Sequence, residues 1–338
     1  MTLNEIFTFE NLYKSHKECR RSKQHKGEVI RFEINLAFNI NNIIKEILNK
    51  NYKIGKYKKF TIYDPKERII EALPYKDRVV LLCFCRQVLI PRIDKRLIYD
   101  NVACRKGKGT EFGRVRLDQF LLREYLKEKN NNFYYLKCDI KKYFPSIDHK
   151  ILLEKLKRIG FNSDELWLIK MFIKSNYSSD VGLPLGNLSS QWFALFYLDS
   201  VDRLIKEVLQ IKSYVRYMDD IILIHRDKAY LQHCKEEIRI HCKEYLKLSL
   251  NQKTQIGKIS NGIDFLGFKH SLMPSGKIIR KLRGSSKVRM KRHLKTLKVL
   301  YEKELVDDEY VYIRKNAFFA HIKNSNESVN FKNKVKPK

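Results

Sequence analysis

Three aspartates stand where their carboxylates could act together. Asp219 and Asp220 lie inside an apolar, β-branched run, residues 213–224, that predicts two strands joined by a tight turn. Asp139 follows another apolar segment, which predicts a third strand. Neighbouring antiparallel strands would bring these acids together, and like charges in one place resist joint ionisation. A divalent cation that prefers hard oxygen ligands, Mg²⁺ or Mn²⁺, would remove that cost.

A carboxylate cluster of this kind predicts nucleotidyl transfer. Two divalent ions about 3.5–4 Å apart can activate an attacking hydroxyl and stabilise a leaving pyrophosphate. Positioning and charge neutralisation then supply most of the rate. An isolated Asp-Asp pair is more often a solvated turn, so the rest of the chain must decide between the two interpretations.

The composition predicts a globular protein that binds a polyanion. The 338 residues are 43% hydrophobic and 12% aromatic, which is enough to build a sizeable core. The net charge of +31 far exceeds what solubility requires and predicts a nucleic-acid partner. An anionic membrane surface is the alternative, but no amphipathic anchor is evident, so we expect no membrane association.

The cysteines and the apolar runs predict a soluble, cytoplasmic protein. Seven cysteines are scattered without a C-x-x-C pair, and an odd number does not suit a disulfide framework. Cys234 and Cys242 lie beside His233 and His241, but no second ligand pair with zinc-finger spacing follows them. The longest apolar runs are too short to span a bilayer, and the N-terminus shows no signal-peptide core.

Hydrophobic periodicity and turn residues predict the elements that position the acids. An amphipathic helix ends near residues 49–51, and strands follow in residues 52–63 and 68–72. A glycine-rich basic loop, residues 101–110, could bind phosphate at the start of the helix that follows it. Further helices are predicted at residues 77–97, 111–129, 163–175, 192–209 and 227–246, the fourth of them capped by Ser189, Ser190 or Gln191.

The order of these segments resembles that of reverse transcriptases. Residues 136–148, which contain Asp139, are similar to motif A of that family. Residues 182–191 are similar to motif B, and the Tyr-Met-Asp-Asp sequence at residues 217–220 is similar to motif C. Each motif is weak alone, and their shared order makes the resemblance specific.

Three further positions extend the resemblance over about residues 50–270. Lys253 stands where motif D has its lysine, and residues 265–267 are similar to motif E at the junction of palm and thumb. The finger motifs of bacterial and group II intron-like reverse transcriptases are similar to the sequence around Arg68, Arg78 and Arg105.

The resemblance implies an α+β fold with the right-hand architecture of polymerases. Residues 1–50 would form an N-terminal helical extension, residues 51–135 the fingers, and residues 136–270 a palm with an antiparallel sheet, interleaved with the fingers. Residues 271–338 would form a basic helical thumb, too short for an RNase H or endonuclease domain. Ten lysines and arginines fall between positions 277 and 298, where they would grip template and primer phosphates. A solvated charged helix is the alternative, although such cations would repel one another without an anion.

The resemblance also implies roles for single residues. Asp139 and Asp219 would hold two Mg²⁺ ions, with Mn²⁺ as a substitute, helped by the Ile140 carbonyl. Asp220 would lie nearby as a partly redundant ligand, and Lys253 would protonate the pyrophosphate. The residues implied to contact the dNTP are Arg68, Arg78, Phe144, Leu185 and Gln191, with Phe144 as the steric gate against a ribose 2′-OH. Those implied to contact template and primer are Arg105, Lys106, Lys108, Gly267, Lys287, Arg289 and Arg292.

One departure from the family pattern concerns fidelity. Most reverse transcriptases carry a glutamine in motif B where this chain has Leu185, which cannot donate a hydrogen bond to substrate. This feature, followed by Asn-Leu-Ser-Ser-Gln, resembles the enzymes of diversity-generating retroelements, which copy template adenines inaccurately. Loss of a polar substrate contact weakens discrimination between correct and incorrect pairs, so we expect low fidelity.

The implied function is an RNA-directed DNA polymerase with template RNA, DNA product and dNTPs as partners. A dedicated non-coding or template RNA and a small accessory protein oligomer are also implied. One alternative is an antiphage defence reverse transcriptase that copies a companion non-coding RNA. Another is a maturase-like, non-catalytic RNA-binding scaffold, which would have no need of clustered acids in a basic protein.

Overall fold

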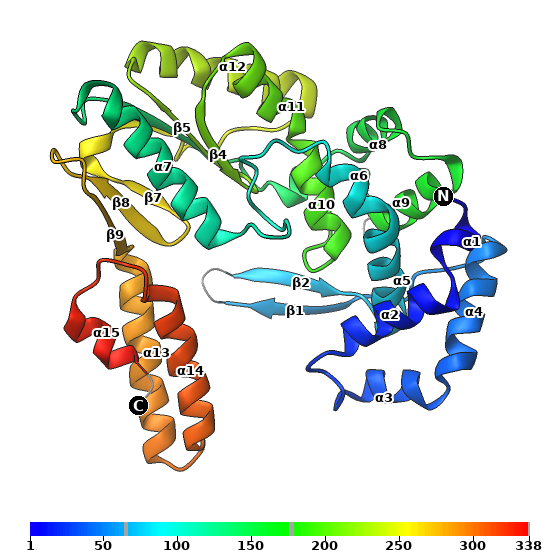
Figure 1. The fold of residues 1–338 in the computed structure, drawn as a ribbon. Helices are drawn as coiled ribbons and strands as arrows, with labels where there is room; N and C mark the ends of the chain where they lie inside the picture. Colours follow the sequence, from blue (N-terminus) through cyan, green and yellow to red (C-terminus); the bar gives the residue numbers. More distant parts are fainter. Residues whose placement is uncertain (64–66, 176–178, 337–338) are drawn as a thin grey trace.

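The structure is a computed structural model that describes residues 1–63, 67–175 and 179–336. Its centre is a four-stranded antiparallel sheet in the order β4-β5-β3-β6 (Figure 1). The strands run over Ser213–Tyr217 (β4), Asp220–His225 (β5), Tyr134–Cys138 (β3) and Gln255–Lys258 (β6). β4 and β5 form a hairpin, and β3 joins it from a distant part of the chain.

Helices cover both faces of this sheet. Side chains alternate along a strand, so β3 sends Tyr135 to one face and Leu136 to the other. Tyr135 packs in one buried cluster with residues of α7 (Thr110–Glu128). Leu136 packs in the other with residues of α12 (Lys228–Leu246). Both faces of the sheet are therefore packed against other elements. This explains why the sequences of these strands are nearly continuous apolar runs.

The chain before residue 50 is helical and lies away from the central sheet (Figure 1). Helices α1 to α4 span Leu3–Ile6, Phe9–Arg20, Gly27–Ile34 and Leu36–Leu48. They contact α5 (Tyr75–Phe84), which continues through a π-helical turn, Cys85–Leu89, into α6 (Ile90–Asp94). The expected helix over residues 77–97 is thus present but contains a π-turn.

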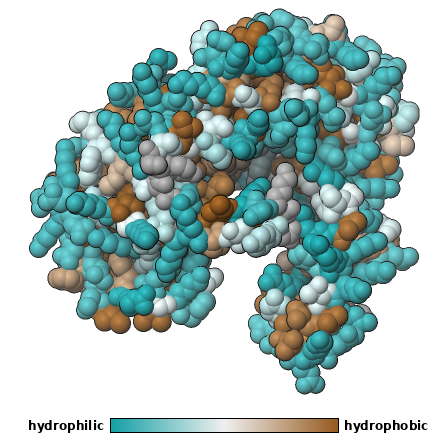
Figure 2. Space-filling model, turned by 180° about the vertical axis from the view of Figure 1, so that it is seen from behind, coloured by the Kyte–Doolittle hydropathy of each residue, from teal (hydrophilic) through white to brown (hydrophobic). Residues whose placement is uncertain are grey.

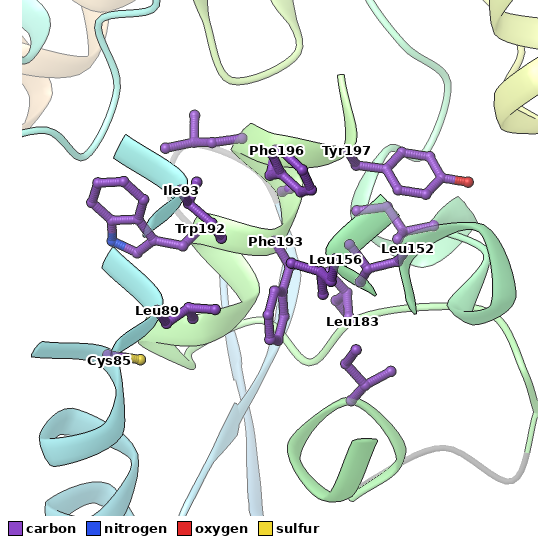
Figure 3. Close-up of a cluster of buried hydrophobic side chains, with 14 of the residues drawn as sticks. Cys85, Leu89, Ile93, Leu152, Leu156, Leu183, Trp192, Phe193, Phe196 and Tyr197 are labelled. Carbon is purple, nitrogen blue, oxygen red and sulfur yellow. The ribbon is translucent and has the colours of Figure 1, made fainter. Parts of the chain in front are cut away.

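A large apolar cluster joins these helices to the palm side of the molecule. Figure 3 shows Cys85, Leu89 and Ile93 facing aromatic side chains of α10 (Leu188–Tyr197), with Leu152 and Leu156 of α8 (His149–Arg158) behind them. The neighbouring helices are α9 (Ser163–Lys174) and α11 (Asp199–Arg203), which runs into a π-turn at Leu204–Val208.

The predicted helix over residues 192–209 was wrong in two respects. It begins earlier, after Asn187, so Ser189, Ser190 and Gln191 are inside the helix and do not cap it. It also breaks at Leu198 before α11, which turns the chain toward β4.

The remaining strands form two small sheets. β1 (Lys58–Ile62) and β2 (Arg68–Ala72) make a two-stranded hairpin that projects from the helical side. β7 (Ile263–Phe265), β8 (Phe268–Leu272) and β9 (Ile278–Leu282) make a three-stranded sheet that follows the palm.

The C-terminal helices form a separate lobe. α13 (Gly284–Glu302), α14 (Asp308–Ile322) and α15 (Val329–Val335) surround a small core of Met290, Ile322, Phe331 and Val335. Seen from behind, the molecule is hollowed between this lobe and the lobe made by the N-terminal half (Figure 2).

Two further expectations concern cofactors and membranes. Cys234 and Cys242 are buried in the apolar core, and His241 Nε2 lies 3.0 Å from Ser200 Oγ. Within the described ranges, no helix is long and apolar enough to cross a membrane.

Candidate active site

The tip of the β4–β5 hairpin carries the paired aspartates. Tyr217 pairs with Asp220 across the ladder, which leaves Met218 and Asp219 as a two-residue turn. β3 runs antiparallel to β5 with Cys138 opposite Ile221, so the next residue, Asp139, emerges beside the turn. The sheet register therefore brings together the three acids that the sequence predicts.

The acids repel one another and are partly shielded from water. Burial, together with the nearby charges of Asp139 and Asp220, raises the pKa of Asp219 to about 6. Burial also raises the pKa of Asp220, while Lys137 opposes this change. A site that resists ionisation in this way binds a cation more favourably than isolated surface carboxylates do.

Asp220 differs from the other two acids because a lysine neutralises it. Lys137 Nζ lies 3.1 Å from Asp220 Oδ1 and donates to the Asp264 carbonyl at 2.6 Å. Lys137 is on β3, two residues before Asp139, and so faces the same side of the sheet. Its role was not predicted from the sequence, although a lysine at this spacing in an apolar strand is a usable signal.

Asp139 is oriented by Asn251, a second residue that the sequence analysis missed. Asn251 Nδ2 donates to Asp139 Oδ2 at 3.0 Å, and the Asn251 backbone nitrogen donates to the Asp139 carbonyl at 2.7 Å. The Asn251 side-chain oxygen also accepts a hydrogen bond from the backbone nitrogen of Lys253 at 3.1 Å. The predicted motif D lysine is thus exposed on the short loop that holds Asp139.

The donor chemistry at the turn fits a divalent cation. Asp139 and Asp219 offer hard carboxylate oxygens, and Ile140, which is buried and bridged to Leu250, follows Asp139 directly. Among residues 1–63, 67–175 and 179–336, no group of three or more His, Cys, Asp and Glu side chains is arranged as a complete metal site. The argument for a cation is therefore that it would relieve the repulsion between the Asp139 and Asp219 carboxylates.

The motif B loop connects the acids to the finger hairpin through its backbone. Leu183 N donates to the Phe144 carbonyl at 3.0 Å, and Glu71 N on β2 donates to the Leu185 carbonyl at 2.8 Å. Gly186 has φ 130°, and a Cβ there would lie 2.8 Å from the Glu71 carbonyl oxygen. Phe144 is half-buried, and its ring contacts that of Tyr143.

Of the residues predicted to contact the dNTP, some are exposed and others are engaged by neighbouring protein residues. Arg68 is exposed on β2. Arg78 forms an ion pair with Glu28 of α3 and lies 5.4 Å from the centre of the Tyr75 ring. Gln191 Oε1 accepts from Cys104 Sγ at 3.3 Å. Of these residues, Arg68 is open to solvent, whereas Arg78 connects α5 to the N-terminal helix α3.

The basic loop before α7 is held in shape by hydrogen bonds from two of its own basic side chains. Arg105 Nε donates to Asp94 Oδ1 at 2.5 Å and Nη1 to the Ile98 carbonyl at 2.7 Å. Lys108 donates to the Tyr99 carbonyl, and burial lowers its pKa to about 8. Lys106 is exposed. The loop thus uses Arg105 to hold its shape and presents Lys106 to solvent.

The predicted residues of the C-terminal part lie at the palm–thumb junction and on α13. Gly267 has φ 86° in the β7–β8 turn, and its carbonyl accepts from Arg283 N at 3.0 Å. Lys287 is paired with Glu327 and lies 4.8 Å from the Phe331 ring centre. Arg292 is exposed and Arg289 is partly exposed, both on α13.

The comparisons with known proteins agree with this geometry. Residues 40–270 match the family model described as reverse transcriptase (RNA-dependent DNA polymerase), which covers more than half of the chain. The chain belongs to the reverse transcriptase family. No curated protein is significantly similar in sequence to this chain.

Solved structures confirm the predicted fold class. A Candida albicans telomerase in complex with a TWJ fragment of telomeric RNA is 13% identical with a TM-score of 0.52, over 78% of this chain and 55% of that one. An apo telomerase from Candida tropicalis is 15% identical with a TM-score of 0.54, over 74% of this chain and 53% of that one. The chain therefore has the α+β polymerase fold with a palm-like antiparallel sheet, and spans about half the length of these telomerases.

Proposed function

We propose that this chain is an RNA-directed DNA polymerase that extends a primer with dNTPs. The observation that supports this proposal most strongly is the meeting of Asp139 and Asp219 at one end of the palm sheet, where burial and the charge of Asp139 oppose the ionisation of Asp219. Divalent ions bound there would activate the primer hydroxyl and stabilise the leaving pyrophosphate. Asp139 and Asp219 would bind both ions, with Mg²⁺ as the physiological metal and Mn²⁺ as a substitute.

The surrounding residues would position substrate in this mechanism. Arg68 on the exposed finger hairpin would bind the triphosphate, and Lys253 on the Asn251 loop would give a proton to the pyrophosphate. Phe144, half-buried beside motif A, would exclude a ribose 2′-OH by steric contact. Asp220, neutralised by Lys137, would contribute less to metal binding than the other two acids.

The hollow between the two lobes supports a template–primer path from the palm to the thumb (Figure 2). Arg289, Arg292 and Lys106 would bind phosphates by charge and not by base recognition. Gly267 would let the backbone of the β7–β8 turn approach the primer closely. In this proposal the N-terminal extension ends at residue 50, the fingers at residue 135 and the palm at residue 270, and the thumb follows.

We further propose that copying is of low fidelity, as in diversity-generating retroelements. The backbone carbonyl of Leu185 is engaged by Glu71 N, and its side chain is a hydrocarbon that can contact a nucleotide only by packing. Leu185→Gln should therefore lower misincorporation opposite template adenine. Equal error rates in Leu185→Gln and the parent enzyme would remove the support for this part of the proposal.

The nucleic acid bound to the protein would distinguish a role in a diversity-generating retroelement from a role in antiphage defence. Sequencing the nucleic acid that copurifies with it would separate a template repeat of a diversity-generating element from a companion non-coding RNA of a defence system. A dedicated RNA and a small accessory protein oligomer are the expected partners in the first setting.

Primer extension on an RNA template with Mg²⁺ tests the main proposal. Wild type should extend the primer, and Asp219→Ala should not. Asp180→Ala is the control, because Asp180 is an exposed aspartate that pairs with Lys174 on the surface. Equal extension by wild type and Asp219→Ala, or none by either with the copurifying RNA supplied, would contradict catalysis and favour a non-catalytic RNA-binding scaffold.

A further inference from the structure

A fully buried ion pair lies beneath the turn that carries Asp219. Arg216 is on β4, and its side chain is completely excluded from solvent, as is that of Asp202 in α11. Arg216 Nε and Nη2 donate to the two Asp202 carboxylate oxygens at 2.7 and 2.5 Å, and Tyr214 Oη donates to the same carboxylate at 2.5 Å. Because removing two charges from water costs several kcal/mol per ion, a buried pair is weak evidence of a contribution to stability.

The other donors of Arg216 reach the turn and a neighbouring helix. Nη1 donates to the Met218 carbonyl at 2.9 Å, and Nη2 also donates to the Leu195 carbonyl in α10 at 3.0 Å. The Met218 carbonyl belongs to the same planar peptide unit as the nitrogen of Asp219. The hydrogen bond to the Met218 carbonyl oxygen therefore fixes the orientation of the peptide plane between Met218 and Asp219.

Met218 has a conformation that needs such a constraint. Its φ is 55°, in the left-handed region. For a residue other than glycine this conformation costs about 1–2 kcal/mol, and glycine, asparagine or aspartate usually occupies such a position in a two-residue hairpin. Methionine has no polar side-chain group that could compensate locally, so the bond from Arg216 to its carbonyl adds to the Tyr217–Asp220 pairing in favouring this turn.

The backbone of Arg216 adds a second connection. Arg216 N donates to the Asp100 carbonyl at 3.0 Å, and Val102 N donates to the Arg216 carbonyl at 3.0 Å. The Asp100 carboxylate in turn accepts from Arg116 Nε at 2.6 Å, on α7. The residue that holds the turn is thus fixed to α7, α10 and α11, and its position is determined by three elements at once.

We propose that the Arg216–Asp202 pair positions Asp219 against Asp139, a role that rests on the proposed polymerase function. Arg216 is a positioning residue that acts through the Met218 carbonyl and does not contact substrate. A guanidinium is required because it donates to Asp202 and to two backbone carbonyls in fixed directions. A lysine could pair with Asp202 as a point charge but could not make this set of contacts.

The test compares folded variants of this pair with a matched ion pair elsewhere. Arg216→Lys keeps the buried charge, and Arg216→Met with Asp202→Leu removes both charges. The control is Arg92→Met with Glu165→Leu, which removes a bidentate pair of 2.7 and 2.8 Å whose carboxylate is fully buried far from the turn. Thermal melting of each protein establishes that it is folded before kinetics are measured.

We expect both Arg216 variants to lose about 100-fold in kcat with little change in KM for dNTP, because misplacement of a reacting group by about 1 Å has this effect. Their affinity for Mn²⁺, measured by electron paramagnetic resonance without nucleic acid, should fall about tenfold. The control should lose thermal stability but keep wild-type kcat and Mn²⁺ affinity.

A folded Arg216→Lys protein with wild-type kcat and Mn²⁺ affinity would overturn the positioning role. If the double variant does not fold, Arg216→Lys decides alone, since it retains a charge for Asp202. An inactive wild type would count against the proposed polymerase function, whereas the Mn²⁺ measurement would still report whether Arg216 orders the acids.

Discussion

The molecule contains two β-hairpins, β1–β2 and β4–β5, that are built in opposite ways. The β4–β5 hairpin is buried along nearly its whole length and carries acids at its tip. The β1–β2 hairpin is mostly exposed and carries cations, among them Arg68. In the proposed function, the acids that would bind metal need a fixed position, whereas the cation that would bind the triphosphate needs to reach its ligand.

The two hairpins are joined by few contacts. The Glu71–Leu185 backbone bond and the close approach of Gly186 link β2 to the motif B loop. That loop continues to Phe144 through Leu183. A dNTP between the hairpins would therefore touch a rigid side and an adjustable side, and the following predictions separate the two.

The largest effect is expected at the rigid hairpin. Asp139→Asn should lower kcat by about 1,000-fold or more, because loss of a metal-binding carboxylate removes several kcal/mol of transition-state stabilisation. Asp220→Asn should cost much less, since Lys137 already neutralises that acid. Single-turnover primer extension measures both, and equal losses would show that Asp220 is a full ligand.

The same acids should reduce stability when no metal is bound. The raised pKa of Asp219 means that its stabilising contribution is complete below pH 3.8 and is lost as pH rises through about 6. Asp219→Asn should therefore be more stable than wild type at pH 8, by on the order of 3 kcal/mol, and the gain should disappear toward pH 4. Urea unfolding in EDTA at both pH values measures this difference, and a gain that does not depend on pH would contradict the electrostatic cause.

The contact between the hairpins depends on Gly186. Gly186→Ala introduces a Cβ 2.8 Å from the Glu71 carbonyl oxygen at φ 130°, so it should cost about 2 kcal/mol of unfolding free energy. Gly284→Ala is the control, because a Cβ there meets no described atom within 4 Å. Similar melting temperatures for the two variants would show that the finger hairpin adjusts without cost.

The smallest effect is expected at the adjustable hairpin. Arg68→Ala should raise KM for dNTP about tenfold through loss of a charge-assisted contact, while leaving the melting temperature unchanged. Lys58→Ala on β1 serves as the control for loss of a surface charge on the same hairpin. A fall in kcat with unchanged KM would place Arg68 in transition-state stabilisation instead of substrate binding.

Local patterns predicted the strands and the acids but not the polar contacts between distant segments. Residues 68–72 and the Asp139 strand were predictable because turn residues and apolar runs are encoded locally. Asn251 and Arg216 were not predicted, because their roles arise only when the α12–β6 loop meets Asp139 and when β4 meets α10 and α11. Arg105 was predicted to bind nucleic acid from its charge, yet its hydrogen bonds hold the loop, which sequence alone does not distinguish.

In the proposed function, Asp139 and Asp219 form one divalent-cation site. Substitution by Fe²⁺ with ascorbate and peroxide cleaves the backbone near the bound ion, and the fragments can be mapped by mass spectrometry. We predict cleavage near residue 139 and at the turn of residues 218–219, suppressed by Mg²⁺ and absent in Asp219→Asn. Cleavage elsewhere in the chain, or the same pattern in Asp219→Asn, would contradict this account of the site.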